Sequence, residues 1–76
     1  MHDTDLMSKF FDNIDGFNKQ AISYIKDGFV DKAIEVYEKK LEYIRYAFEF
    51  DVISAERACI MRIDTRRVID ILSCEE

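Results

Sequence analysis

The sequence predicts an all-α protein, folded as an up-down-up bundle of three helices. The chain contains no proline and only two glycines in 76 residues, so few positions favour tight turns. Hydrophobic residues make up 49% of the chain, and in three segments they recur at spacings of three and four, the period of an amphipathic helix. A chain of this length forms one domain, and we take residues 1–76 as its bounds.

The first predicted helix covers residues 4–27. Its apolar stripe starts at Met7 and continues to Gly28 with spacings that alternate between three and four. Gly16 lies within this stripe and is the residue most able to divide it, but the unbroken pattern favours one helix. We expect Gly28 to end the helix at the C′ position, where a left-handed backbone is common.

The second predicted helix covers residues 30–50 and is apolar on two sides. One stripe holds Val30, Ala33, Ile34, Tyr37, Leu41, Ile44 and Phe48. A second stripe holds Val36, Tyr43 and Phe50. A helix with two apolar sides is expected to contact two neighbours.

The third predicted helix covers residues 54–72, with Asp51 or Ser54 at its start. Its main stripe holds Ala58, Met61, Thr65, Val68 and Leu72, and a further set, Ile60, Ile63 and Ile71, falls on another face. Since the two connections are short, consecutive helices pack antiparallel and the second helix lies between the others.

The centres of the three stripes are the expected core. Four residues occupy these centres and should all be buried: Phe17, Tyr37, Leu41 and Met61.

Composition excludes several classes of function. The net charge of −5 disfavours nucleic acid and anionic membranes as partners, and no apolar run is long enough to insert into a bilayer. One histidine, His2, cannot complete a zinc site with Cys59 and Cys74 or form a Ser/His/Asp set. We therefore expect no enzyme activity, no catalytic residue, no metal and no cofactor.

The cysteines also bear on location. Cys59 and Cys74 lie fifteen residues apart on one predicted helix, a separation of roughly 22 Å at 1.5 Å per residue, which no disulfide can span. Free thiols are typical of a reducing compartment, so we expect a cytoplasmic protein.

The segment from Lys26 to Phe50 resembles the helix–turn–helix of a tetratricopeptide repeat, but the chain contains only one such unit. It is more similar to the MIT (microtubule-interacting and transport) domain, a three-helix bundle whose first hairpin looks like a tetratricopeptide unit. The matching residues are Ala21, Asp27, Ala33-Ile34, Tyr37, Leu41-Glu42-Tyr43-Ile44 and Ala47. The third helix fits less well: Arg57-Ala58 and Arg66 match, and the loop before it is shorter than in the family.

The resemblance implies a protein-binding module that recognises the C-terminal tails of ESCRT-III-type subunits. Such a module would be the N-terminal targeting domain of an AAA ATPase or related protein in endosomal sorting and vesicle transport. The implied partner is a helical or extended peptide tail, bound by a monomer in the cytoplasm, with recruitment to endosomal membranes through partners. The alternative is a structural or assembly subunit, either a helical dimer or a small chaperone partner.

The candidate peptide-binding residues lie on the second and third helices. They are Tyr43, Tyr46, Phe50, Ile60, Ile63, Asp64 and Arg67. The aromatic residues either line a groove for a partner or pack on the third helix. In the family, a helical tail packs between the second and third helices against an aliphatic residue in the middle of the third.

Two questions about the third helix remain open from the sequence. The position of that aliphatic residue falls on Ile63 or on Asp64. If Asp64 occupies it, a charged group faces the ligand, and binding of a helical tail is weakened or replaced by binding of an extended peptide between the first and third helices. The arginines of the third helix, Arg57, Arg62, Arg66 and Arg67, either pair with Asp64 and Asp70 on a solvated face or clamp acidic residues of a ligand. A basic tail is the opposite alternative, bound by the carboxylates of the second helix, Glu35, Glu38, Glu42 and Glu49.

Overall fold

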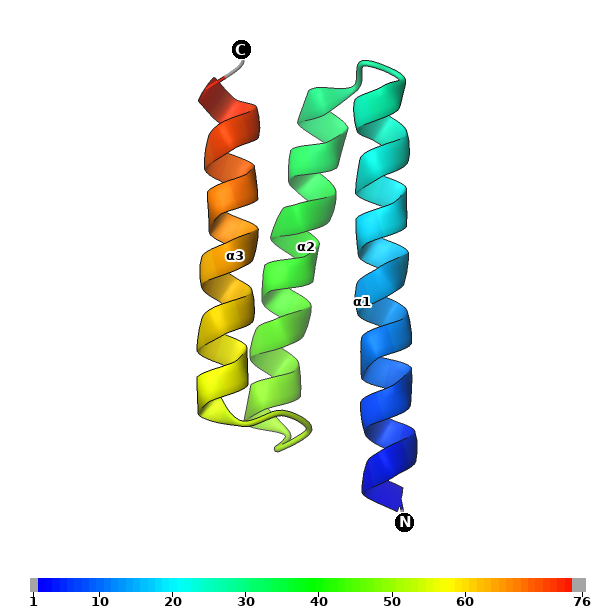
Figure 1. Cartoon of the computed structure of the whole chain (residues 1–76), viewed down its shortest axis with the longest axis vertical. Helices are drawn as coiled ribbons and strands as arrows, with labels where there is room; N and C mark the ends of the chain where they lie inside the picture. The colour runs from blue at the N-terminus through cyan, green and yellow to red at the C-terminus, as the bar shows by residue number, and fades with distance from the viewer. Residues whose placement is uncertain (1, 75–76) are drawn as a thin grey trace.

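The chain forms three antiparallel α-helices. The computed structural model describes residues 2–74, with side chains from residue 5 onward. Its helices are α1 (His2–Lys26), α2 (Val30–Glu49) and α3 (Ala55–Cys74). They run up, down and up, with α2 in the middle (Figure 1). The predicted all-α three-helix bundle is confirmed, and each predicted helix boundary is within two residues of the observed one.

The turn between α1 and α2 is a Schellman motif centred on Gly28. The N–H of Gly28 donates to the carbonyl of Ile25 at 3.1 Å, and the N–H of Phe29 donates to the carbonyl of Tyr24 at 2.8 Å. Gly28 has φ of 85°, a left-handed conformation that glycine adopts without steric cost. The predicted C′ role of Gly28 is therefore confirmed.

The turn between α2 and α3 repeats this motif without a glycine. Asp51 has φ of 60°, and its N–H donates to the carbonyl of Phe48 while Val52 donates to that of Ala47. Ser54 then caps α3, since its Oγ accepts a hydrogen bond from the N–H of Arg57 at 3.2 Å. Of the two predicted starts, Ser54 is the cap and Asp51 ends the preceding helix.

α1 continues through Gly16 without a break. A Cβ added at this glycine meets nothing within 4 Å, so neither a turn nor a close approach requires it. The unbroken stripe predicted a single helix, and this prediction is confirmed.

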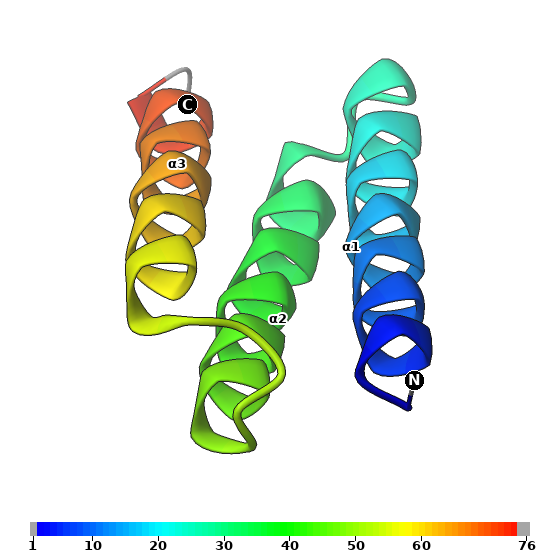
Figure 2. The ribbon, with the colours of Figure 1, turned by 60° about the horizontal axis from the view of Figure 1, so that its bottom comes forward.

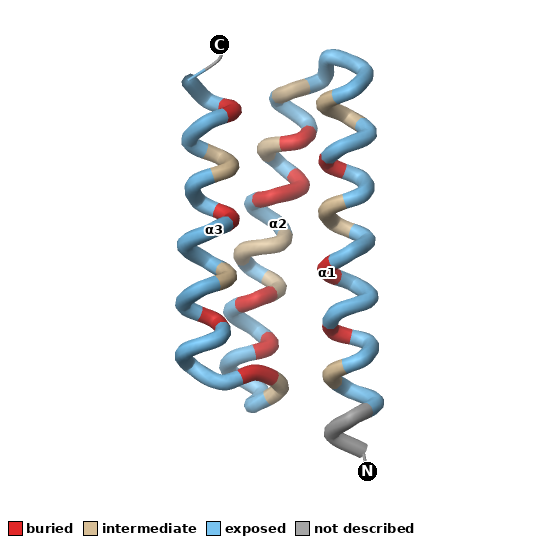
Figure 3. Tube along the Cα trace, viewed as in Figure 1, coloured by how far each residue is buried: buried red, intermediate tan, exposed pale blue. Residues whose placement is uncertain are grey.

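The core consists of two apolar clusters, one toward each end of the bundle (Figure 3). The cluster near the α2–α3 turn contains Phe10, Ile14, Ile44, Ala47, Ile53 and Ala58. The cluster near the α1–α2 turn contains Ala21, Ala33, Val36, Tyr37 and Leu72. Each cluster includes residues from all three helices, so side-chain packing ties α1 and α3 to α2 at both levels.

A pair of polar side chains, Lys40 and Asn18, lies between the two apolar clusters. Lys40, on α2, donates from Nζ to Oδ1 of Asn18 on α1 at 2.9 Å and lies 5.8 Å from the ring centroid of Tyr37. Desolvation lowers the pKa of Lys40, and the carboxylate of Asp64 on α3 opposes that shift. Burial raises the pKa of the Tyr37 phenol. Lys40 therefore links α1 to α2 between the two clusters.

The predicted core is only partly correct. Tyr37 is buried, but Phe17, Leu41 and Met61 are only half-buried. Phe17 packs against the edge of the cluster near the α1–α2 turn, and Met61 packs against the edge of the cluster near the α2–α3 turn. Between the clusters, Thr65 in the middle of α3 is buried.

The helix backbones contact each other only in sequence-adjacent pairs in the described chain, α1 with α2 and α2 with α3. Figure 2 shows α1 and α3 on either side of α2. A side-chain contact nevertheless joins α1 and α3: the guanidinium carbon of Arg57 on α3 lies 5.5 Å from the ring centroid of Phe11 on α1. Within the described residues, no helix is long and apolar enough to cross a membrane.

Candidate functional site

The seven candidate residues do not form one site. Tyr43, Tyr46 and Phe50 line a pocket of about 290 Å³ between α1 and α2. Ile63 lines a different pocket, of about 220 Å³, between α2 and α3. Ile60 borders a third hollow beside Arg57 and Met61, and Asp64 and Arg67 are exposed on α3.

The aromatic stripe of α2 faces α1 and not α3. Tyr43 stacks on Phe10, with ring centroids 5.5 Å apart and planes at 12°, and also contacts Phe17 at 5.6 Å. Its hydroxyl oxygen accepts a hydrogen bond from Nδ2 of Asn13 at 2.7 Å. Packing on the third helix, one of the two alternatives for these aromatic residues, is therefore wrong for Tyr43. Its contacts with Phe10, Phe17 and Asn13 stabilise the packing of α1 on α2.

Tyr46 and Phe50 lie further out in the same pocket. Tyr46 is 44% exposed and Phe50 is 77% exposed, beside Leu6 of α1 at 51%. Arg45 covers part of Tyr46, with its guanidinium carbon 5.4 Å from the ring centroid. The side chains of Leu6, Tyr46 and Phe50 form an exposed apolar rim of this α1–α2 pocket.

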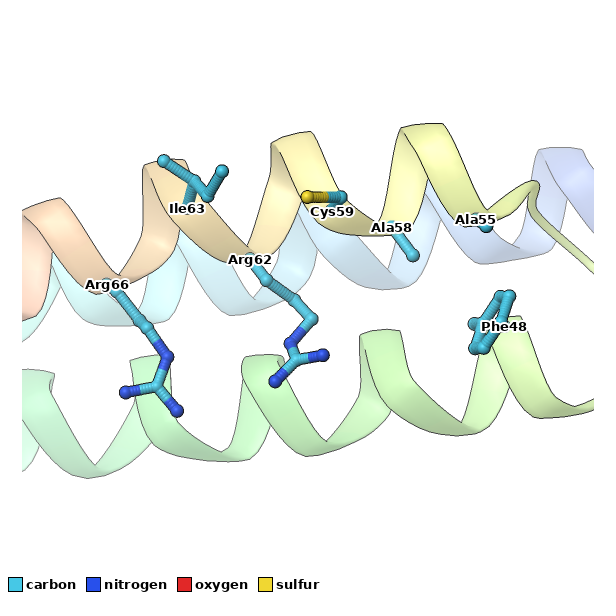
Figure 4. Close-up of a pocket in the computed structure, with 7 residues that line it drawn as sticks. All are labelled: Phe48, Ala55, Ala58, Cys59, Arg62, Ile63 and Arg66. Atoms are coloured by element: carbon cyan, nitrogen blue, oxygen red, sulfur yellow. The ribbon is translucent and has the colours of Figure 1, made fainter.

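The pocket between α2 and α3 combines apolar and basic groups. Its lining residues are Phe48, Ala55, Ala58, Cys59, Arg62, Ile63 and Arg66. Figure 4 shows Phe48 on α2 beneath Ala55 and Ala58, with the side chains of Arg62 and Arg66 reaching from α3 toward α2. We call this pocket the α2–α3 groove. It offers an apolar surface with two guanidinium groups beside it.

Small side chains create this groove. Phe48 falls on the stripe that predicts burial, yet its side chain is 43% exposed. The residues of α3 next to it in the groove include Ala55, Ala58 and Cys59, which are too short to cover an aromatic ring. The ring of Phe48 therefore contributes apolar surface to the groove.

The structure distinguishes the two candidate positions in the middle of α3. Ile63 lines the α2–α3 groove and is 48% exposed. Asp64 is exposed and does not line this groove. Of the two residues, Ile63 is the one that offers an aliphatic contact in this groove.

The binding residues predicted from the sequence do not include Phe48, and they include neither Arg62 nor Arg66, which appear only among the arginines of the third helix. Phe48 was assigned to the core because its stripe is continuous. The sequence feature that could have predicted its exposure is the pair of alanines at the start of the third helix, Ala55 and Ala58. Small residues at the start of the next helix leave a large side chain uncovered.

The described residues contain no group of three or more His, Cys, Asp or Glu side chains that could hold a metal ion. Cys59 and Cys74 are free and exposed.

Comparison of the chain with protein-family models, curated proteins and solved structures finds no match.

Proposed function

We propose that this chain is a protein-binding module that takes a short segment of a partner in the α2–α3 groove. The observation that carries this proposal is the pairing of two large, half-exposed apolar side chains, Phe48 and Ile63, at one pocket. Amphipathic helices dock in such grooves by inserting aliphatic side chains at helical spacing. Apolar groups that line a concave surface are typical of a binding site.

The exposed area sets the scale of the interaction. Phe48 is 43% exposed and Ile63 is 48% exposed. Full burial of such a side chain contributes about 1.5–3 kcal/mol, so covering the exposed half of both contributes roughly 1.5–3 kcal/mol. At 1.4 kcal/mol per factor of ten, this is about 10- to 140-fold in affinity. Loss of this contact is therefore measurable.

The resemblance to MIT domains supports a narrower version of the proposal. In that version the partner segment is the C-terminal tail of an ESCRT-III-type subunit, and the chain is the targeting module of an AAA ATPase or related protein in membrane remodelling. An Ile63 in the groove suits the leucine-rich helical tails that such domains bind between their second and third helices. Recruitment to endosomal membranes would follow from the partner.

Binding of labelled ESCRT-III tail peptides, measured by fluorescence anisotropy, tests the proposal. Ile63→Asp should weaken a bound tail by about 30-fold or more, because it places a carboxylate against an apolar contact. Since Ile63 is 48% exposed, the helical circular dichroism signal should be unchanged. Phe50→Asp is the matched control, since Phe50 is exposed in the α1–α2 pocket.

The outcomes separate the two grooves. Loss of binding in Ile63→Asp with retention in Phe50→Asp supports the α2–α3 groove. The reverse pattern would move the site to the α1–α2 pocket. Absence of binding by any tail peptide would contradict the narrower version.

An assembly subunit is the second candidate, and the exposed rim of Leu6, Tyr46 and Phe50 favours it. A second protein chain that buries this rim would explain three large apolar groups at one pocket. Sedimentation equilibrium distinguishes the two functions. A monomer over a wide concentration range supports the peptide-binding module, and a tight dimer supports the assembly subunit.

A further inference from the structure

The α2–α3 groove has a charge that differs from that of the protein as a whole. The chain carries a net charge of −5, yet two arginines, Arg62 and Arg66, line the groove. Both side chains extend from α3 along the same side of the pocket (Figure 4). A groove of this kind attracts a partner whose charge is opposite to that of its two guanidinium groups.

Other arginines of the chain are engaged with its own aromatic rings. The guanidinium carbon of Arg45 lies 5.4 Å from the ring centroid of Tyr46, and that of Arg57 lies 5.5 Å from the ring centroid of Phe11. These two contacts stabilise the fold and cover apolar surface. Arg62 and Arg66 instead border the apolar floor formed by Phe48 and Ala58.

We infer that the partner of the α2–α3 groove is an acidic amphipathic segment, whose aliphatic side chains contact Phe48 and Ile63 while adjacent carboxylates pair with Arg62 and Arg66. This inference rests on the proposed function of the same groove and specifies the chemistry of its ligand.

The spacing of the two arginines fits carboxylates on a helix. Residues four apart on a helix have Cβ atoms about 5–6 Å apart on one face, so Arg62 and Arg66 match two Glu or Asp residues one turn apart on a partner helix. Guanidinium groups bind carboxylates through two parallel hydrogen bonds, which lysine cannot reproduce. The arginines therefore select for charge and also fix the register of the segment.

A displayed peptide library tests this chemistry directly. We suggest 16-residue helical peptides with leucines fixed at helical spacing and Glu or Lys allowed at each flanking position, sorted against the full chain. The wild-type chain should enrich peptides with Glu beside the leucines, and Arg62→Glu combined with Arg66→Glu should enrich Lys at those positions. For single peptides, the Glu form should bind the wild type about tenfold more tightly than the Lys form, since exposed pairs are weak singly and add modestly.

A control variant separates local pairing from overall charge. Lys19→Glu combined with Lys39→Glu changes the net charge by the same amount, but both residues are exposed and neither lines the groove. This variant should keep the wild-type preference for Glu. Arg62→Lys combined with Arg66→Lys keeps the charge and should bind Glu peptides less tightly than the wild type, because the bidentate geometry is lost.

The result distinguishes the inference from the proposed function. Leucine peptides that bind with no charge preference, or with a preference for Lys, and that are lost in Ile63→Asp would overturn the inference and support the function. An unchanged preference in the Arg62 and Arg66 double charge reversal would also overturn the inference. Recovery of no leucine peptide would overturn both.

Discussion

Replacement of Ile44 by alanine is the sharpest test of the packing. Ile44 is 0% exposed and lies in the cluster with Phe10, Ile14 and Ala47. The change removes three carbon atoms, worth about 0.8 kcal/mol each in transfer free energy, and it leaves a cavity that relaxes only in part. Together these effects should reduce the free energy of unfolding by about 3–4 kcal/mol, within the usual range for such changes.

This loss is large relative to the whole. At about 0.05–0.15 kcal/mol per residue, a chain of 76 residues has a free energy of unfolding of roughly 4–11 kcal/mol. Urea unfolding monitored by circular dichroism measures the change, and the melting temperature should fall by about 12–30 °C. Leu41→Ala is the matched control, because Leu41 is only half-buried and should cost about 1–2 kcal/mol. Equal losses in the two variants, or a loss below about 0.5 kcal/mol for Ile44→Ala, would refute the placement of the core.

Three further predictions concern the backbone and one buried hydroxyl, all measured by urea unfolding. Gly16→Ala should stabilise the chain by about 1 kcal/mol, since a Cβ there meets nothing within 4 Å. Gly28→Ala should destabilise it by about 1 kcal/mol, because Gly28 has φ of 85°. Equal effects of the two substitutions would contradict both assignments. Asp51→Gly should stabilise by a few tenths to about 1 kcal/mol, since Asp51 has φ of 60°, and a loss of stability would contradict the strain. Thr65→Val should change stability by less than about 0.5 kcal/mol, because the buried Oγ1 donates only to the Met61 carbonyl one turn earlier, and a loss above about 1 kcal/mol would show that the hydroxyl has another role.

The helices could be predicted from the sequence because their signals are local. The stripe that contains Phe10, Ile14 and Ala21 has one period from end to end, and all three residues are buried. Gly28 marks the end of α1 because the left-handed conformation favours glycine. Asp51 adopts the same left-handed conformation, but the sequence does not identify it as the end of α2. Aspartate is also a favoured residue at the start of a helix, so it could equally be assigned to the start of α3.

The candidate site was harder to predict because periodicity does not say which neighbour a face meets. Tyr43 and Phe50 fall on one side of α2 by spacing, but only the arrangement of the bundle turns that side toward α1. Exposure at Phe48 depends on the size of residues on another helix, which the pattern of α2 does not contain. The hydrogen bond of Lys40 could not be predicted for the same reason, since its partner Asn18 comes from another helix.

The order in which the helices contact one another has a consequence for how quickly the chain folds. In the described chain, each pair of helices whose backbones touch is joined by a short connection, residues 27–29 for α1 and α2 and residues 50–54 for α2 and α3. Each hairpin therefore closes with little loss of chain entropy, and either one can form first with α2 as the shared template. A topology dominated by such local contacts folds within microseconds to milliseconds, so partly folded chains with exposed apolar stripes should be short-lived.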